Sequence, residues 1–248
     1  MTDTVLYEEM RPETFRARIA EAPIAYLPLG TLEWHGEHLP LGSDGLQSQG
    51  FFIELARLAG GIVLPMLFLG PDRSERVDGK EFYGMDTYDQ PHGGGFTQLD
   101  GSAYWANDEL FEDILKAVLK QLRRAGFRIV VGHGHAPSKA VFQRNIEQWG
   151  KEFDLELFVC SRDNEKDGLG IQTDHAAANE TSLVMALRPE LVKMDNLSPD
   201  PDDWPFGVGG QDPRTHASAQ VGHQAIEMQG QRMAKILAES LAKLGNDS

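Results

Sequence analysis

Three short segments of the chain combine histidine with carboxylates, the side chains that bind transition metals and transfer protons. In chain order they hold Glu33, His35 and Asp44; His133 and His135; and Asp174, His175 and Glu180. Imidazole and carboxylate together suit zinc, manganese or iron(II) better than calcium, which prefers all-oxygen ligands. Since these candidate ligands outnumber the needs of one tetrahedral ion, the segments predict two divalent ions that share a bridging carboxylate.

Each segment follows a stretch that reads as a buried strand. IAYLPLG (24–30) precedes the first, RIVV (128–131) the second, and LELFVC (155–160) with its loop the third. Ligands of open α/β sheets bind beyond the carboxyl ends of the strands, so the three segments should meet there. Residues two apart in an extended chain point the same way, which predicts that Glu33 and His35 face one point, as do His133 and His135.

The rest of the chain alternates apolar runs with amphipathic stretches. A further strand is expected over 61–67, and helices over 46–59, 108–125, 138–149, 180–187 and 217–244, with Asp108 as an N-cap and Gly126 as a stop. This order predicts an α/β fold, a three-layer α/β/α arrangement with a mainly parallel sheet, in a single domain over 1–248. Two long segments, 71–107 and 198–215, break the pattern, and the first is expected to form a pocket wall.

Composition narrows the class of protein. The 248 residues carry a net charge of −15, so neither nucleic acid nor an anionic membrane is an expected partner. No apolar run is long enough to span a bilayer, and the first ten residues lack the features of a signal peptide, so a cytoplasmic protein is expected. The single cysteine, Cys160, ends an apolar run and is expected to be buried rather than reactive.

A structural interpretation competes with the metal site. A single histidine near a strand end is more often a hydrogen-bonded structural residue than a ligand. Glu37 and His38 can serve only to solvate or brace their turn. Three mixed clusters, each at a strand end, are harder to explain in that way.

The sequence resembles the creatininase (creatinine amidohydrolase) family. The first family motif, G-x-x-E-x-H-G-x-H-L-P-L-x-x-D, is matched by GTLEWHGEHLPLGSD, which starts at Gly30. The second, N-G-H-x-x-N, is matched in part by VGHGHAPS at Gly132 and His133, without its asparagines. The third, H-A-G-x-x-E-T-S, appears as HAAANETS from His175. A segment like the family's G-D-P-x-x-A-S follows near the C-terminus.

The resemblance implies a role for each of these residues. Glu33, Asp44 and His133 would hold one ion, and His35 and Asp44 the other, with Asp44 as the bridge. Relatives that cleave creatinine complete the second ion with a glutamate; here either His135, which stands at that position, or Glu180 would do so. His175 stands at the position of the catalytic histidine and would transfer a proton to the leaving group. Family members form homo-oligomers, often hexamers, and the same is expected here.

The resemblance fixes the chemistry more closely than the substrate. A metal-bound hydroxide would cleave a C–N bond in a small cyclic or linear amide. Relatives that cleave creatinine enclose its flat ring with tryptophan near the catalytic histidine. Creatinine itself is not expected here, because the stretch GLGIQTD directly before His175 contains no aromatic residue. Arg73, Tyr83 and His92 in the long segment could bind a polyhydroxylated or anionic substrate, or much of this segment could instead form a subunit contact or a solvated loop. One alternative is a hydrolase that opens a cyclic keto-polyol of the inosose type at a C–C bond. Another is an inactive metal- or ligand-binding protein on the same fold.

Overall fold

The computed structural model describes residues 4–88, 96–160 and 169–246. Its central sheet has four parallel strands in the order β2-β1-β5-β6. They are β1 (Ile24–Leu29), β2 (Ile62–Val63), β5 (Ile129–Gly134) and β6 (Glu156–Val159). The two central strands, IAYLPL and IVVGHG, are buried along their whole length, including His133. Sheet order and direction agree with the prediction of a mainly parallel sheet.

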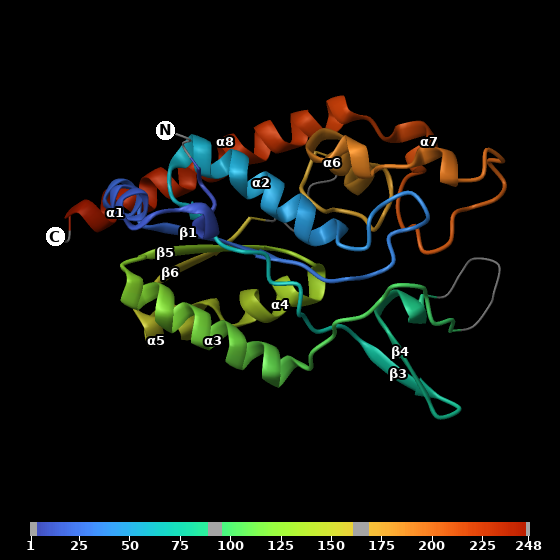
Figure 1. Ribbon diagram of the computed structural model, residues 1–248, viewed down its shortest axis with the longest axis horizontal. Coiled ribbons are helices and arrows are strands. Elements are labelled where there is room, and N and C mark those ends of the chain that lie inside the picture. Colours follow the sequence, from blue (N-terminus) through green and yellow to red (C-terminus); the bar gives the residue numbers. More distant parts are fainter. Residues whose placement is uncertain (1–3, 89–95, 161–168, 247–248) are drawn as a thin grey trace.

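Helices cover both faces of the sheet (Figure 1). One layer contains α2 (Ser43–Ala59), α6 (Ala178–Leu187) and α8 (Ala219–Asn246), and the other contains α3 (Asp108–Ala125), α4 (Ala136–Arg144) and α5 (Ile146–Phe153). The short elements are η1 (Tyr7–Glu9), α1 (Pro12–Glu21), η3 (Pro189–Leu191), η4 (Met194–Asn196) and α7 (Pro213–His216). A separate apolar core lies between the sheet and each layer. The three-layer α/β/α fold predicted from the sequence is confirmed.

Local differences from the predicted elements have physical causes. The helix expected over 138–149 is two helices, joined at Asn145, whose side chain donates to the carbonyl of Val141. The N-cap of α3 is Asn107 rather than Asp108, because the Asn107 side chain accepts the N–H of Leu110. The strand expected over 61–67 pairs regularly only at Ile62–Val63, and Pro65 follows without a backbone N–H to donate.

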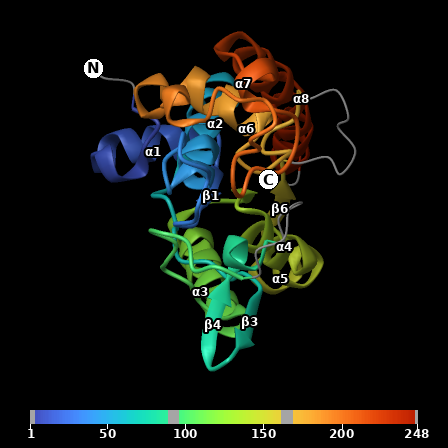
Figure 2. The same ribbon diagram turned by 90° about the vertical axis from the view of Figure 1, so that its right-hand side faces the viewer.

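Part of the long segment 71–107 projects from the rest of the protein (Figure 1). Its first part forms the antiparallel hairpin β3 (Ser74–Val77) and β4 (Lys80–Tyr83), followed by η2 (Gly84–Thr87). The hairpin projects from the same end of the molecule as the carboxyl ends of β1 and β5 (Figures 1 and 2). The base of this segment, next to Asp72 and Gly84, therefore lies at the sheet edge where the predicted site residues end.

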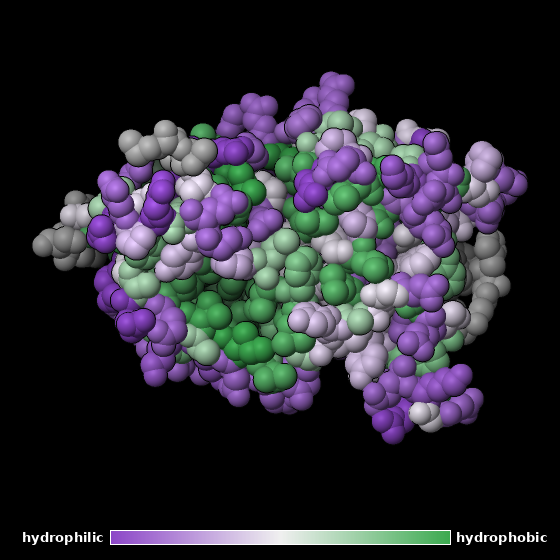
Figure 3. Space-filling view, viewed as in Figure 1, coloured by the Kyte–Doolittle hydropathy of each residue, from purple (hydrophilic) through white to green (hydrophobic). Residues whose placement is uncertain are grey.

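Apolar residues gather on the surface of the protein beside β2, an edge strand of the sheet. This surface faces the viewer in the middle and lower left of Figure 3. Leu110 on α3 and the preceding Tyr104 are 51% and 61% exposed. Within the described ranges, no helix has the length and apolarity needed to cross a membrane.

Candidate metal centre

Six of the predicted site residues meet beyond the carboxyl ends of β1 and β5. In the described part of the chain, three sets of potential ligand atoms lie within 4.8 Å of one another. They are Glu33, His35 and His175; Glu33, Asp44 and His135; and His35, Asp44 and Glu180. The sets overlap, so they form one cluster at the floor of a cavity of about 500 Å³. The cluster joins all three sequence segments.

His35 is held with one nitrogen free. Its Nδ1 donates to the carbonyl of Glu33 at 3.0 Å, so Nε2 is the nitrogen that can bind an ion once its proton is released. That Nε2 is buried, has no hydrogen-bond partner in the described structure, and lies 3.6 Å from both Asp44 Oδ2 and Glu180 Oε2. Ligands of a tetrahedral zinc with bonds of about 2.1 Å are about 3.4 Å apart. The residues present therefore fit a divalent ion among these three atoms.

Glu33, His35 and Asp44 each belong to two of the three sets, and Asp44 is the carboxylate shared by the set with His135 and the set with Glu180. It lies in the first turn of α2, and its Oδ1 accepts from Gln172 Nε2 at 2.9 Å while Oδ2 faces His35. Gln172 has a φ of +55°, a region that a residue with a side chain adopts at a cost of about 1 kcal/mol or more. No sequence motif indicates Gln172, which fixes the orientation of Asp44.

Glu180 is placed by the start of α6. Both oxygens of Asp174 accept backbone N–H groups there, from Asn179 and from Glu180 itself. Glu180 Oε2 accepts the N–H of Ala176 at 2.7 Å. Asp174 thus has a structural role at the helix terminus, and the side chain of Glu180 is directed at His35.

His133 does not join this cluster, in contrast to its predicted role as a ligand beside Glu33 and Asp44. Its side chain follows the alternation of β5 and points toward α2. There its ring contacts Phe51 and Phe52, and its Nδ1 lies 3.3 Å from Ser48 Oγ. Burial lowers the pKa of His133 to about 3, which keeps the imidazole neutral among these apolar neighbours.

His135 occupies the position expected of His133. Gly134 breaks the strand alternation with a φ of +139°, and a Cβ there would lie 1.7 Å from the carbonyl oxygen of Leu29. The chain then turns, and His135 reaches Glu33 and Asp44. The structure thus brings His135, two residues beyond His133, to Glu33 and Asp44. Glu180, not His135, lies with His35 and Asp44.

The long segment contributes to the site differently from the prediction. Asp72, which no motif indicated, has a side chain only 8% exposed and lies 3.2 Å from His135. Arg73 lines the cavity. Tyr83 does not line it: its hydroxyl donates to Glu81 and its ring stacks on Trp105. His92, the third predicted substrate contact, lies outside the described residues.

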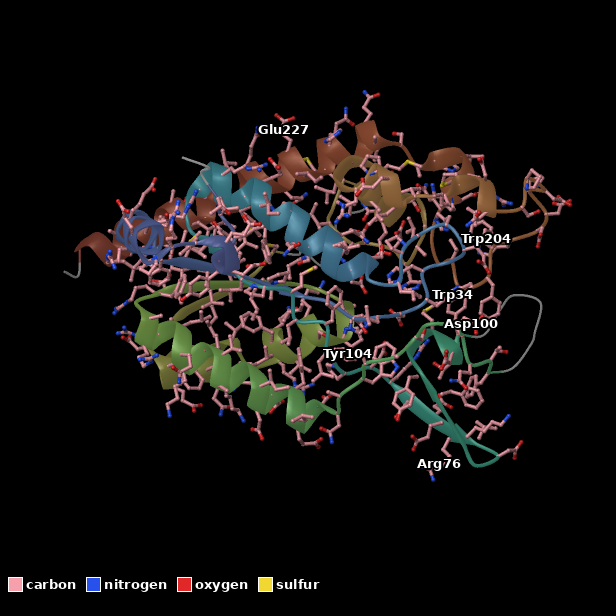
Figure 4. The ribbon with its side chains drawn as sticks, viewed as in Figure 1. Trp34, Arg76, Asp100, Tyr104, Trp204 and Glu227 are labelled. Atoms are coloured by element: carbon pink, nitrogen blue, oxygen red, sulfur yellow. The ribbon has the colours of Figure 1, made fainter. Side chains whose placement is uncertain are left out.

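His175 lines the cavity beside His35, with ring centroids 4.4 Å apart. Its Nε2 donates to the carbonyl of Trp34 at 2.9 Å, and its backbone pairs with Gly209. Trp34 in turn donates to the carbonyl of Phe206. Figure 4 shows Trp34 and Trp204 at the end of the molecule from which the hairpin projects. The backbone pairing with Gly209 and the bond to Trp34 therefore fix the position of His175.

Electrostatics in the cluster reflect buried charges of the same sign. Burial raises the pKa of Glu33 to about 7, despite the neighbouring His135 and His35, and raises that of Glu180 well above its usual value. Burial opposes a charge on His35, but Asp44, Glu180 and Glu33 together raise its pKa to about 10. Without an ion, bound protons must neutralise the negative charge of these carboxylates. A divalent cation would displace those protons.

Comparisons with known proteins identify the family of the chain. The family model for creatininase, described as creatinine amidohydrolase, matches residues 8–244. The chain is 26% identical to a creatinine amidohydrolase of Pseudomonas putida, over 98% of this chain and 96% of that protein.

Solved structures of creatininase share the fold. A crystal structure of creatininase superposes with a TM-score of 0.73 at 21% identity, covering 96% of this chain and 98% of the other. A creatininase variant of the Zn–Zn type superposes with a TM-score of 0.71 at 23% identity, with the same coverage. The chain belongs to the creatininase family of metal-dependent hydrolases.

Proposed function

We propose that this protein hydrolyses a C–N bond in a small cyclic or linear amide, using two divalent ions bridged by Asp44. One observation carries the proposal: among the described residues the buried His35 Nε2 has no hydrogen-bond partner, and it faces two carboxylate oxygens at 3.6 Å. A carboxylate of that set, Asp44, also belongs to a neighbouring set with Glu33 and His135. A protein that only stores or senses one ion does not need a second set sharing a ligand with the first.

The proposed ligands divide between two positions. Glu33, Asp44 and His135 would hold one ion, and His35, Asp44 and Glu180 the other. Zinc, manganese and iron(II) are all compatible with such mixed ligands. Bound there, the ions would polarise a substrate carbonyl and lower the pKa of a water molecule toward neutrality.

His175 is the proposed proton carrier. Because Nε2 donates to Trp34, the other ring nitrogen is left to exchange a proton with the leaving group. Burial and the nearby His35 lower the pKa of His175 to about 3, so it starts as a neutral base. Arg73, on the cavity wall, would bind a carbonyl or an anionic group of the substrate.

A second candidate substrate class is supported by the cavity wall. Among the described residues that line the cavity, the rings are imidazoles, and carboxylates predominate. A wall of this kind suits the hydroxyl groups of a cyclic keto-polyol better than a flat apolar ring. Hydrolytic opening of such a ketone at a C–C bond is therefore the alternative reaction, and loss of activity with retained metal binding is the alternative of another class.

A substrate screen tests the proposal. The metal-loaded protein is incubated with small amides, lactams and keto-inositols, and amine release and ring opening are followed by mass spectrometry. Amide hydrolysis that disappears in His175→Ala and persists in His223→Ala, an exposed histidine on α8, supports the proposal. Turnover of keto-inositols, with no hydrolysis of any amide, would favour the alternative reaction, the opening of a cyclic keto-polyol. Metal-loaded protein without turnover of any compound would favour the inactive protein.

The family resemblance supports three further proposals. The whole chain, 1–248, forms one hydrolase domain; it assembles as a homo-oligomer, for which a hexamer is the expectation; and it acts in the cytoplasm. The apolar surface along the β2 edge supports the second of these, because such a surface suits a subunit contact (Figure 3). Light scattering that finds a monomer of 27.5 kDa would contradict it.

A further inference from the structure

Trp34 holds the proposed proton carrier through its backbone. The carbonyls of Glu33 and Trp34 follow one another in the turn after β1. The first accepts from His35 Nδ1 at 3.0 Å, and the second accepts from His175 Nε2 at 2.9 Å. The two imidazole rings, with centroids 4.4 Å apart, are therefore held through opposite nitrogens. In a neutral ring, the bond to Trp34 leaves Nδ1 of His175 as the nitrogen without a proton.

One short segment, 206–209, is bound to both partners of the bond between His175 and Trp34. Gly209 pairs with the backbone of His175 in both directions, at 3.0 and 2.8 Å. Phe206 accepts the indole N–H of Trp34 with its carbonyl at 3.0 Å. His175 and Trp34 are 141 positions apart in the chain, so this segment sets where the donor meets its acceptor.

The indole ring of Trp34 packs directly against the backbone of that segment. Gly207 has a φ of +71°, and a Cβ there would lie 2.8 Å from Trp34 Cδ1 and 3.0 Å from its Nε1. Glycine adopts this conformation without strain and leaves room for the ring. The backbone N–H of Trp34 donates to Ser102 Oγ at 3.0 Å. The N–H, the side chain and the carbonyl of Trp34 are thus all bound, which fixes the orientation of the carbonyl.

We propose that Trp34 is a positioning residue for the reaction: its indole bond to Phe206 holds the Trp34 carbonyl in place, and this carbonyl selects the His175 tautomer that is unprotonated at Nδ1. The inference rests on the proposed function, in which His175 carries the proton. Without the indole bond the carbonyl can turn away, and the imidazole can adopt the tautomer with its proton on Nδ1, which cannot accept another there. Trp34 does not line the cavity, so its effect on the reaction would pass through His175.

Nuclear magnetic resonance of the zinc-loaded protein tests the proposal without a substrate. Histidine labelled with ¹⁵N reports which ring nitrogen carries the proton, and the signals that disappear in His175→Ala belong to His175. Trp34→Phe keeps an aromatic ring and removes the indole N–H. Trp204→Phe is the matched control, because Trp204 is also half-buried and donates its indole N–H to the same segment, to the carbonyl of Val208 at 2.8 Å. Ser102→Ala, which removes the acceptor of the Trp34 N–H, repeats the test if Trp34→Phe does not fold, as judged by circular dichroism.

In the wild type and in Trp204→Phe, we expect the His175 proton on Nε2. In Trp34→Phe this proton should exchange with water about tenfold faster, as for loss of one hydrogen bond, and a fraction of His175 should carry its proton on Nδ1. With an amide substrate, kcat of Trp34→Phe should fall by about 10–100-fold at unchanged KM, as for loss of other groups that orient an imidazole, and both ions should be retained.

Wild-type exchange and kcat in Trp34→Phe would overturn the proposal. An equal change in Trp204→Phe would overturn it too, because the segment would then need anchoring in general and Trp34 would have no particular role. Wild-type protein that hydrolyses no amide would contradict the proposed function, whereas the His175 signals of Trp34→Phe would still decide whether Trp34 positions this ring.

Discussion

Replacing Asp44 by asparagine should remove most of the thermal stabilisation that metal ions confer. Asp44 belongs to both ligand sets, and its Oδ2 lies 3.6 Å from His35 Nε2. A ligand at a thousand times its Kd adds about 4.1 kcal/mol to the stability of the native state. For a protein of this size, 1 kcal/mol raises the Tm by about 2–4 °C. One ion should therefore raise the Tm by about 8–16 °C, and two ions by about twice that.

Differential scanning calorimetry of metal-free and metal-loaded protein measures this shift. Asp44→Asn should lose most of it, whereas Glu180→Gln, which changes one set only, should keep about half. Asp113→Asn, on the exposed side of α3, should keep all of it. A full shift in Asp44→Asn would refute the bridging role. An equal loss in Glu180→Gln would refute the assignment of Glu180 to one ion.

Three further predictions concern neighbouring residues. His175→Ala should retain both ions while kcat falls by about 10²–10⁴-fold, as for loss of a general acid or base; loss of metal would instead make His175 a ligand. His35 has a pKa of about 10 in the metal-free protein, so at pH 7 it is protonated and must release a proton to bind an ion. Metal affinity should therefore rise with pH, and calorimetric titrations in buffers of different ionisation enthalpy should detect the released proton; no dependence on the buffer would contradict this. Gln172→Leu should weaken metal binding by about 10–100-fold through loss of its bond to Asp44, measured by chelator competition; wild-type affinity would show that Asp44 needs no support.

Hydrophobic periodicity was sufficient to predict the layers of the fold. The face of α3 that carries Phe111, Leu115, Leu119 and Leu122 is buried as its helical spacing requires, and Gly126 ends the helix in a left-handed conformation. Helix termini depend on which polar side chain accepts a particular N–H. That choice between Asn107 and Asp108 is not visible in the spacing of apolar residues.

The candidate site was predictable where its residues are close in sequence. Glu33, His35 and Asp44 meet because one turn and one helix start carry them. The structure places His135 rather than His133 beside Glu33 and Asp44, because Gly134 adopts a positive φ and ends the strict alternation of β5.

Asp72 and Gln172 were missed for a different reason. Each reaches the cluster from a segment without periodicity or motif, and only the tertiary structure brings them to His135 and Asp44. Gly84 has no room for a side chain because Glu33 and Asp72 lie against it. From the sequence, however, nothing distinguishes it from the other glycines, of which the chain has 26 in all. Its significance appears only when the neighbouring oxygens are known.

Anomalous X-ray diffraction from crystals grown with zinc or manganese tests the central claim most directly. The structure predicts two peaks per chain on either side of the Asp44 carboxylate. One should lie among Glu33, Asp44 and His135, and the other among His35, Asp44 and Glu180. A single peak, or peaks outside this cluster, would contradict a two-ion centre bridged by Asp44.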